Sequence, residues 1–171
     1  MSNDKISEMP AYRIGHGYDV HGFGEGDYVI LGGVKIPYHH GFIAHSDGDV
    51  LIHSLCDALF GSIAAGDIGQ HFPDTNDAYK NIDSCILLGQ TSQLLKQEFY
   101  FIVNVDITIV AQAPKMSPYI QAMRKRLAEI LDIAITQINI KSTTTEKLGF
   151  TGREEGIAVH SVVMVYRNSL N

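Results

Sequence analysis

The sequence has little cysteine and no excess of positive charge. Its 171 residues include two cysteines, 13 Lys or Arg and 19 Asp or Glu, which gives a net charge of −6. A chain with this balance has no overall basic field to hold nucleic acid or an anionic membrane. Cys56 and Cys85 lack the spacing of a metal-binding cysteine pair, so we expect two reduced, partly buried thiols.

Long apolar segments are missing as well. No apolar run approaches the ~20 residues that a membrane span needs, and residues 1–10 lack the apolar stretch of a secretory signal. We therefore expect a cytoplasmic protein without a membrane partner. The hydrophobic content of 45% suits one compact domain with a real core. We expect a flexible tail over residues 1–11 and a single domain over 12–171.

The hydrophobic pattern predicts an α+β fold. Alternating and apolar runs predict strands over residues 12–20, 28–36 (a hairpin), 100–110, 137–141 and 156–166. Helical spacing predicts helices over 48–65, 82–98 and 118–131, with loops over 38–47, 66–77 and 142–153. In the central strand we expect Phe101, Val103, Val105, Ile107 and Ile109 to share one buried face. This order predicts a two-layer, ferredoxin-like sandwich in which helices cover one face of a mixed sheet.

A candidate metal site combines the first strand with the first helix. Asp19 and His21 are two residues apart, so their side chains point to the same face of a strand. Asp49, His53 and Asp57 recur every four residues and form a polar row, which we expect opposite the core. One Asp and two His with an open fourth position are the ligand pattern of a catalytic zinc site. The alternative is that the histidines are ordinary surface or hydrogen-bonded residues.

Two polar segments suit a phosphate. Ser46 or Asp47 is expected to cap the first helix, and His45 would then lie beside a helix N-terminus that can bind phosphate. Residues 143–153 combine hydroxyls, Glu146 and cations in a loop that suits a phosphate with Mg²⁺. Each segment has a plainer interpretation, as a helix cap or a polar loop. No P-loop motif is present, and the glycines at 22, 24 and 26 do not fit the dinucleotide-binding pattern.

Six segments, in order between Tyr12 and Tyr166, together resemble the 2-C-methyl-D-erythritol 2,4-cyclodiphosphate synthase family. They are residues 13–21, 44–50 with His53, 66–69, 72–75, 111–116 and 143–153. The resemblance implies that family's fold and a homotrimer with active sites at the subunit interfaces. It also implies a reaction of the non-mevalonate isoprenoid pathway. There the 2-phosphate of 4-diphosphocytidyl-2-C-methyl-D-erythritol 2-phosphate attacks the β-phosphate, which forms the cyclodiphosphate and releases CMP.

The resemblance further implies roles for individual residues. Asp19, His21 and His53 would hold zinc, and Glu146 would hold Mg²⁺ or Mn²⁺. His45 and Thr144 match the catalytic positions that stabilise the transition state. The substrate contacts would be Asp19, Val20, His21, His45, Ser46, Asp67, Ile68, Gly69, Phe72, Pro73, Asp74, Thr75, Asn76, Ala111, Gln112, Ala113, Pro114, Lys115, Met116, Ser117, Thr143, Thr144, Thr145, Glu146, Phe150 and Arg153. The chain departs from the family at Asn76-Asp77, where Asp-Pro is usual, and at Ser142, where Ala is usual.

Two other functions stay open at this point. Two His and one carboxylate also form the metal triad of non-haem iron oxygenases, although their usual all-β scaffold conflicts with three predicted helices. The second alternative is a non-catalytic trimer that binds nucleotides or isoprenoid phosphates. The presence of all the metal-type residues and of Thr144 argues against such an inactive relative.

Overall fold

The computed structural model describes residues 11–44, 46–73, 79 and 82–167, and the statements below concern that part of the chain. The strands are β1 (Tyr12–Gly24), β2 (Tyr28–Leu31), β3 (Val34–Pro37), β4 (Gly41–Phe42), β5 (Tyr100–Val110), β6 (Ile138–Thr143) and β7 (Gly156–Arg167). The helices are α1 (Val50–Ser62), α2 (Ile68–His71), α3 (Ser84–Gln97), α4 (Ile120–Leu131), the 3-10 turn η3 (Ile135–Gln137) and α5 (Gly149–Gly152). No helix among these is both long and apolar enough to cross a membrane.

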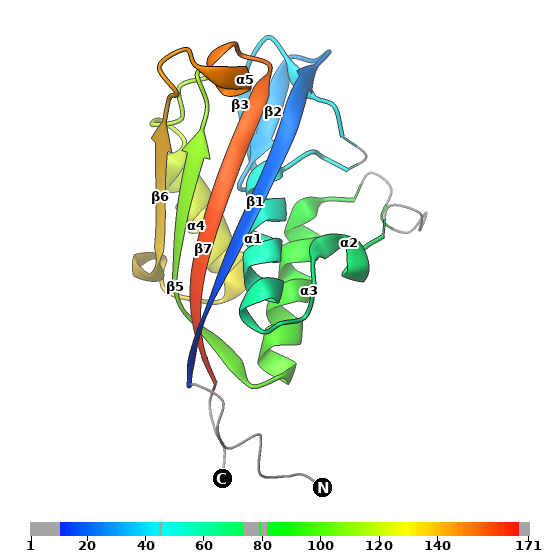
Figure 1. The fold of residues 1–171 in the computed structure, drawn as a ribbon, viewed down its shortest axis with the longest axis vertical. Helices are drawn as coiled ribbons and strands as arrows, with labels where there is room; N and C mark the ends of the chain where they lie inside the picture. Colours follow the sequence, from blue (N-terminus) through cyan, green and yellow to red (C-terminus); the bar gives the residue numbers. More distant parts are fainter. Residues whose placement is uncertain (1–10, 45, 74–78, 80–81, 168–171) are drawn as a thin grey trace, which may run out of the picture.

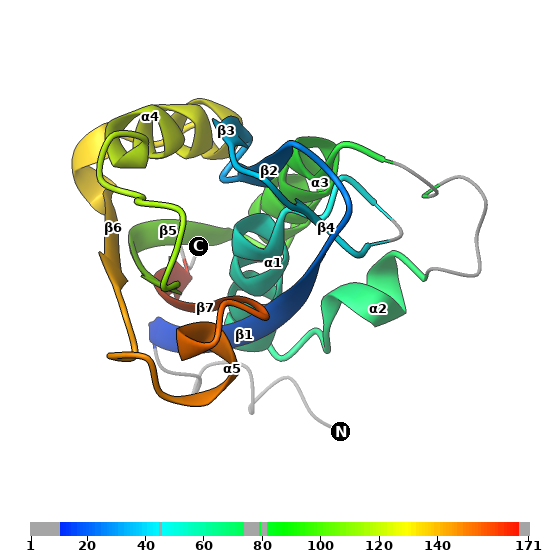
Figure 2. The ribbon, with the colours of Figure 1, turned by 90° about the horizontal axis from the view of Figure 1, so that it is seen from above.

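Five strands form one mixed sheet in the order β4-β1-β7-β5-β6 (Figure 1). Only β5 and β6 run parallel, while β7 lies antiparallel to both β1 and β5. The strands β2 and β3 form a separate hairpin. The helices α1, α3 and α4 all lie on one face of the sheet (Figure 2). The predicted α+β sandwich with helices on one face of a mixed sheet is therefore confirmed.

Helix α1 lies directly on the backbone of β1. A Cβ atom at Gly15 would stand 1.8 Å from the carbonyl oxygen of Ala58, and one at Gly17 would stand 1.9 Å from that of Ser54. Only glycine permits such an approach. The other sides of α1 contact β7 and α3, which explains why most of its side chains are buried. This close packing brings the middle of α1 to the middle of β1.

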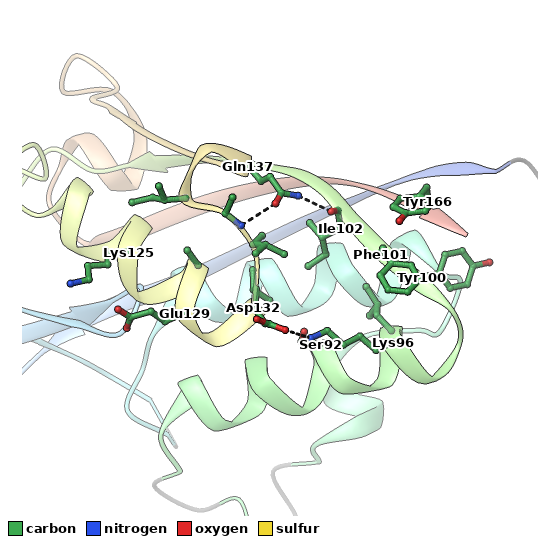
Figure 3. A pocket seen from close by; sticks show the side chains of 16 residues that line it. Ser92, Lys96, Tyr100, Phe101, Ile102, Lys125, Glu129, Asp132, Gln137 and Tyr166 are labelled. Atoms are coloured by element: carbon green, nitrogen blue, oxygen red, sulfur yellow. Dashed lines mark hydrogen bonds and ion pairs between the residues drawn. The ribbon is translucent and has the colours of Figure 1, made fainter. Parts of the chain in front are cut away.

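The alternation predicted for the central strand is wrong at its beginning. Tyr100 is 5% exposed, whereas Phe101 is 37% exposed and stacks on Tyr166 on the outer face of the sheet. The cause is a β-bulge: Ile102 pairs with β7, the next paired residue is Asn104, and the extra residue between them shifts the alternation by one. The side chain of Gln137 donates to the carbonyl group of Ile102 at 2.9 Å (Figure 3) and to that of the next residue at 3.0 Å, so it satisfies two carbonyl groups at the bulge.

The cap of α1 also differs from the prediction. Asp49 is the N-cap, and neither Ser46 nor Asp47 takes that place. Its fully buried carboxylate accepts hydrogen bonds from the backbone N–H groups of Gly32, Gly33 and Ile52, at 2.7 to 3.0 Å. The carboxylate is held inside because it satisfies both the helix end and the turn between β2 and β3. Asp49 is therefore not part of a polar row opposite the core.

The predicted loops contain short elements. Strand β4, helix α2 and helix α5 lie within the segments expected to be loops, and β1 continues four residues past its predicted end to Gly24. Elements of two to four residues are too short to show a hydrophobic period, which is why pattern reading missed them. Residues 1–10 lie outside the described part, so the flexible tail stays a prediction.

Candidate metal centre

Three side chains from β1 and α1 converge in one place. Asp19 and His21 project from the same face of β1, as their spacing predicts, and His53 faces them from α1. The Asp19 Oδ2 atom lies 3.1 Å from His21 Nε2 and 3.4 Å from His53 Nδ1. One ligand atom from each residue falls within 4.8 Å of the others, so these three residues form a possible metal-binding triad.

The proton of the neutral His21 ring lies on the nitrogen that faces away from Asp19. His21 Nδ1 lies 2.8 Å from the carbonyl oxygen of Gly48, which can only accept, so Nδ1 carries the proton and Nε2 of the neutral ring carries a lone pair. Asp19 Oδ2 is buried without a hydrogen-bond partner of good geometry. Such an orphaned oxygen beside two ring nitrogens fits a cation, which can satisfy all three atoms at once.

The spacing and chemistry of the triad fit zinc. Zinc ligands at about 2.0–2.1 Å in a tetrahedral arrangement lie roughly 3.3 Å from one another, close to the 3.1 and 3.4 Å separations of Asp19 from the two histidines. Burial alone would raise the pKa of Asp19, but the close contacts with His21 and His53 and the backbone N–H of Val20 outweigh it and hold that pKa well below its usual range. The carboxylate therefore stays charged and available to a cation.

A cavity of about 290 Å³ opens beside the triad. The three triad residues and Asp57 line it. The other lining residues are Ile43, Ala44, Ser46, Ile68, Gly69, Phe72, Tyr79, Ile82 and Leu87. Asp57 Oδ1 accepts from the backbone N–H of Ile68 at 2.8 Å and so attaches α2 to α1. Burial raises the pKa of Asp57, although that backbone bond opposes the shift. The cavity therefore joins the triad to the first turn of α2.

Helix α2 supplies one wall of the cavity. Its N-cap is Asp67, whose side chain accepts from Gln70 N and Gln70 Nε2, both at 2.9 Å. Ile68 and Gly69 line the cavity, and so does Phe72 at the helix end. Pro73 follows directly in the chain. His45 and the predicted contacts Asp74, Thr75 and Asn76 lie outside the described residues, so their roles stay predictions.

The remaining predicted residues gather at another edge of the sheet. Because β5 and β6 are parallel and Val110 pairs with Thr143, the loops that follow them begin side by side. The N–H of Ala111 donates to Thr143 O at 3.0 Å, and the N–H of Lys147 donates to Gln112 Oε1 at 3.3 Å. These bonds join residues 111–117 to residues 143–147.

Within residues 143–147 the side chains predicted to be catalytic and magnesium-binding touch each other. Thr144 Oγ1 donates to Glu146 Oε1 at 2.9 Å. Glu146 and Lys147 both have positive φ angles, 52° and 67°, which non-glycine residues rarely adopt. Phe150 lies in α5, and Arg153 at the end of α5 forms a two-bond ion pair with Glu155 at 2.8 and 3.1 Å. The loop therefore adopts a strained backbone conformation that its surroundings must stabilise.

The described members of the two groups of predicted residues do not line one cavity within a single chain. The loops after β5 and β6 lie on the far side of β7 from β1, while α2, whose residues line the cavity, lies on the opposite side of β1 (Figures 1 and 2). No residue of 111–117 or 143–153 is among the described residues that line the cavity. The sequence missed other lining residues, such as Tyr79 and Leu87, because nothing in a loop or an apolar helix marks them.

A larger groove of about 1140 Å³ lies elsewhere, between α3, α4 and the beginning of β5 (Figure 3). Its floor is mostly apolar, and an exposed ion pair between Lys96 and Asp132 at 3.1 Å crosses it. None of the predicted site residues that the structure describes lines this groove. The triad cavity is therefore the better candidate for chemistry, because it combines metal-type ligands with a helix N-terminus.

The fold and the triad define an α+β protein with a metal-type site between its sheet and its central helix. Residues 12–166 match the YgbB family, and the chain belongs to that family. A relative from Ectopseudomonas mendocina, called 2-C-methyl-D-erythritol 2,4-cyclodiphosphate synthase, is 61% identical over 155 residues, which cover 91% of this chain and 99% of the relative. A protein of the same name from Thioalkalivibrio sulfidiphilus is 60% identical over 157 residues, 92% of this chain and 98% of its own.

Solved structures agree with this family. The bifunctional IspDF from Campylobacter jejuni superposes with a TM-score of 0.88 at 46% identity; the match covers 92% of this chain and 42% of that longer one. The Plasmodium falciparum IspF CDP complex superposes with a TM-score of 0.82 at 34% identity and covers 94% and 100% of the two chains. The cyclodiphosphate-synthase-like fold is thus confirmed, and neither an iron oxygenase nor an inactive binding protein is favoured.

Proposed function

We propose that this chain is an enzyme that converts 4-diphosphocytidyl-2-C-methyl-D-erythritol 2-phosphate to 2-C-methyl-D-erythritol 2,4-cyclodiphosphate and CMP in the cytoplasm. An oxygen of the 2-phosphate forms a new bond to the β-phosphorus. The bond from that phosphorus to the bridging oxygen breaks, and CMP leaves with the electron pair. The observation that carries the proposal is the triad of Asp19, His21 and His53 beside the first turn of α2. The synthases that share about 60% of this sequence support the same conclusion.

The residues of the chain bind and orient a polyanion. Asp19, His21 and His53 would hold zinc and Glu146 would hold Mg²⁺, ions that when bound neutralise phosphate charge and withdraw electrons from phosphorus. Ser46, which lines the cavity, and Asp67, the N-cap of α2, would orient the methylerythritol phosphate part through hydrogen bonds. The Thr144 hydroxyl, which donates to Glu146 here, would donate to a phosphate oxygen instead. Positioning and charge neutralisation carry such phosphoryl transfer, without a protein nucleophile.

The active site would lie between neighbouring subunits of a trimer. Residues 111–117 and 143–153 do not line the cavity of their own chain. They would instead complete the active site of a neighbouring subunit and supply the cytidine pocket there. The face of the sheet opposite the helices exposes large apolar side chains, including Tyr12, Ile14, Tyr18 and Val162, which are 41–67% exposed. An apolar face of this kind is typical of a protein interface.

Release of CMP from the cytidylated substrate, with and without a chelator, tests the function. We expect CMP and a cyclic diphosphate, seen by phosphorus NMR, and no product after chelation. Metal-loaded protein that yields neither product would refute the proposed function. Mixing Asp19→Ala with Lys115→Ala protein tests the shared site, because exchange of subunits should restore partial activity. A monomer by light scattering would refute the trimer.

A further inference from the structure

The histidine that α1 contributes to the triad is held from behind by two polar residues. While His53 Nδ1 faces Asp19, the other ring nitrogen, Nε2, lies 3.0 Å from the hydroxyl oxygen of Ser84. Ser84 is the first residue of α3 and is fully buried. Its hydroxyl donates to Asp47 Oδ1, and its backbone N–H donates to Asp47 Oδ2 at 3.0 Å. The order of contacts is therefore Asp47, Ser84, His53 and the metal position.

The direction of each hydrogen bond in this row follows from the groups involved. A carboxylate only accepts, so the single hydroxyl proton of Ser84 is committed to Asp47. The Ser84 oxygen can then only accept from His53, which requires the proton of the neutral ring to be on Nε2. The lone pair is left on Nδ1, the atom that faces Asp19. A second hydroxyl, Ser46 Oγ, stands farther from Nε2, at 3.4 Å, and accepts from Gly48 N.

His21, the other histidine of the triad, carries its proton on the opposite ring nitrogen to His53. The carbonyl group of Gly48 fixes the proton of His21 on Nδ1 and leaves Nε2 toward Asp19. Gly48 and Asp47 are neighbours, so a single short segment before α1 sets which nitrogen of each ring is free. Hydrogen bonds of this kind orient metal-binding histidines and raise the basicity of the ligand atom.

We propose that Asp47 and Ser84 are positioning residues that keep His53 in the Nε2–H tautomer, so that Nδ1 can bind the metal ion. The inference rests on the metal centre of the proposed function and deepens it. It predicts that metal affinity depends on the direction of the hydrogen bonds between Asp47, Ser84 and His53. A purely structural role, in which Asp47 only attaches the α1 loop to the beginning of α3, predicts altered stability with unchanged metal affinity.

The variant Asp47→Asn separates these two roles, because it keeps the size of the side chain and changes the direction of the bond to Ser84, at the cost of one long bond from Asp49 N at 3.3 Å. The N–H of Ser84 still needs an acceptor, so the amide oxygen of the asparagine takes that place. The amide nitrogen then donates to the Ser84 hydroxyl, whose proton turns toward His53 Nε2. His53 must accept there and carry its proton on Nδ1, the atom that should bind the metal.

The experiment measures zinc affinity by chelator competition for the wild type, Asp47→Asn and Ser84→Ala. We expect both variants to bind zinc about 10–100-fold more weakly, the usual effect of losing such a partner of a ligand. Nitrogen NMR of the metal-free protein should show His53 protonated on Nε2 in the wild type and on Nδ1 in Asp47→Asn. Activity of Ser84→Ala should recover when zinc is raised to saturation.

Asp83→Asn is the matched control. Asp83 caps the same helix by accepting from Cys85 N at 2.8 Å, but its hydrogen bonds do not reach His53. We expect its zinc affinity to equal that of the wild type. If Asp47→Asn does not fold, Ser84→Ala carries the test. If Ser84→Ala and Asp47→Asn bind zinc as tightly as the wild type does, the positioning role of Ser84 and Asp47 is wrong, but the metal centre stands. A wild type that binds no zinc would overturn the metal centre as well.

Discussion

Replacing Gly17 by alanine should separate the two elements that carry the triad. The added Cβ would stand 1.9 Å from Ser54 O and 2.7 Å from Ala58 N, whereas ordinary contact for a Cβ begins at 3.4 Å. These are backbone atoms of α1, so no side chain can turn away to make room. Relieving the closest contact requires α1 to move from β1 by about 1.5 Å, the difference between 3.4 and 1.9 Å.

That movement acts on both stability and metal binding. Overpacking usually lowers the free energy of unfolding by about 1–3 kcal/mol, and we expect the upper part of that range because the obstacle is backbone. His53 precedes Ser54 on the moving helix, while Asp19 stays on β1. Metal sites tolerate ligand displacements of only about 0.2 Å. We therefore expect Gly17→Ala to lose most of its zinc affinity.

Urea unfolding of metal-free protein and zinc competition measure the two effects. The matched control is Gly89→Ala in α3, where a Cβ meets no atom within 4 Å. That variant should gain about 0.5–1 kcal/mol, because alanine favours helix over glycine, and should bind zinc normally. If Gly17→Ala changes stability by less than about 0.5 kcal/mol, the range of a neutral surface change, and keeps its zinc affinity, the close packing of α1 on β1 is refuted.

Three further predictions concern the same region. Gly48 has a φ of 74°, and a Cβ there would stand 3.0 Å from Phe42 Cβ; Gly48→Ala should lower stability in urea by about 1–2 kcal/mol and weaken zinc binding through His21. Asp49→Asn should lose about 1.5–3 kcal/mol in the same assay, since one backbone N–H then faces an amide N–H₂; an unchanged midpoint would contradict this. Free zinc at 100 times its Kd should stabilise the wild type by about 2.7 kcal/mol, and calorimetry should show no such gain in His21→Ala.

The sequence by itself determined the longer strands and helices and one half of the possible metal-binding triad. The strand and helix periods predicted the layers of the sandwich, because each element must bury one face. The D-x-H spacing placed Asp19 and His21 on one face of β1, since side chains two apart on a strand share a face. Both results depend on residues a few positions apart, and local backbone geometry is enough to relate them.

Only the tertiary structure decided which side chains meet across elements. Asp49, His53 and Asp57 have the spacing of one helical row in the sequence, but the first is buried in a cap, the third bonds to α2, and among them His53 is the one that reaches Asp19. Ser84 touches His53 from 31 residues away and has no distinctive neighbours in the sequence.

Two further features were decided by the tertiary structure. One is the bulge that turns Phe101 outward, and the other is the separation of the triad from the loops that follow β5 and β6. A bulge shifts every later side chain of its strand by one position, and no hydrophobic period records it in advance. The distance between the triad and the Thr144 loop follows from the strand order, in which β7 enters between β1 and β5. Such relations depend on how closely whole elements approach one another, which is set by packing and is invisible in a local pattern of residues.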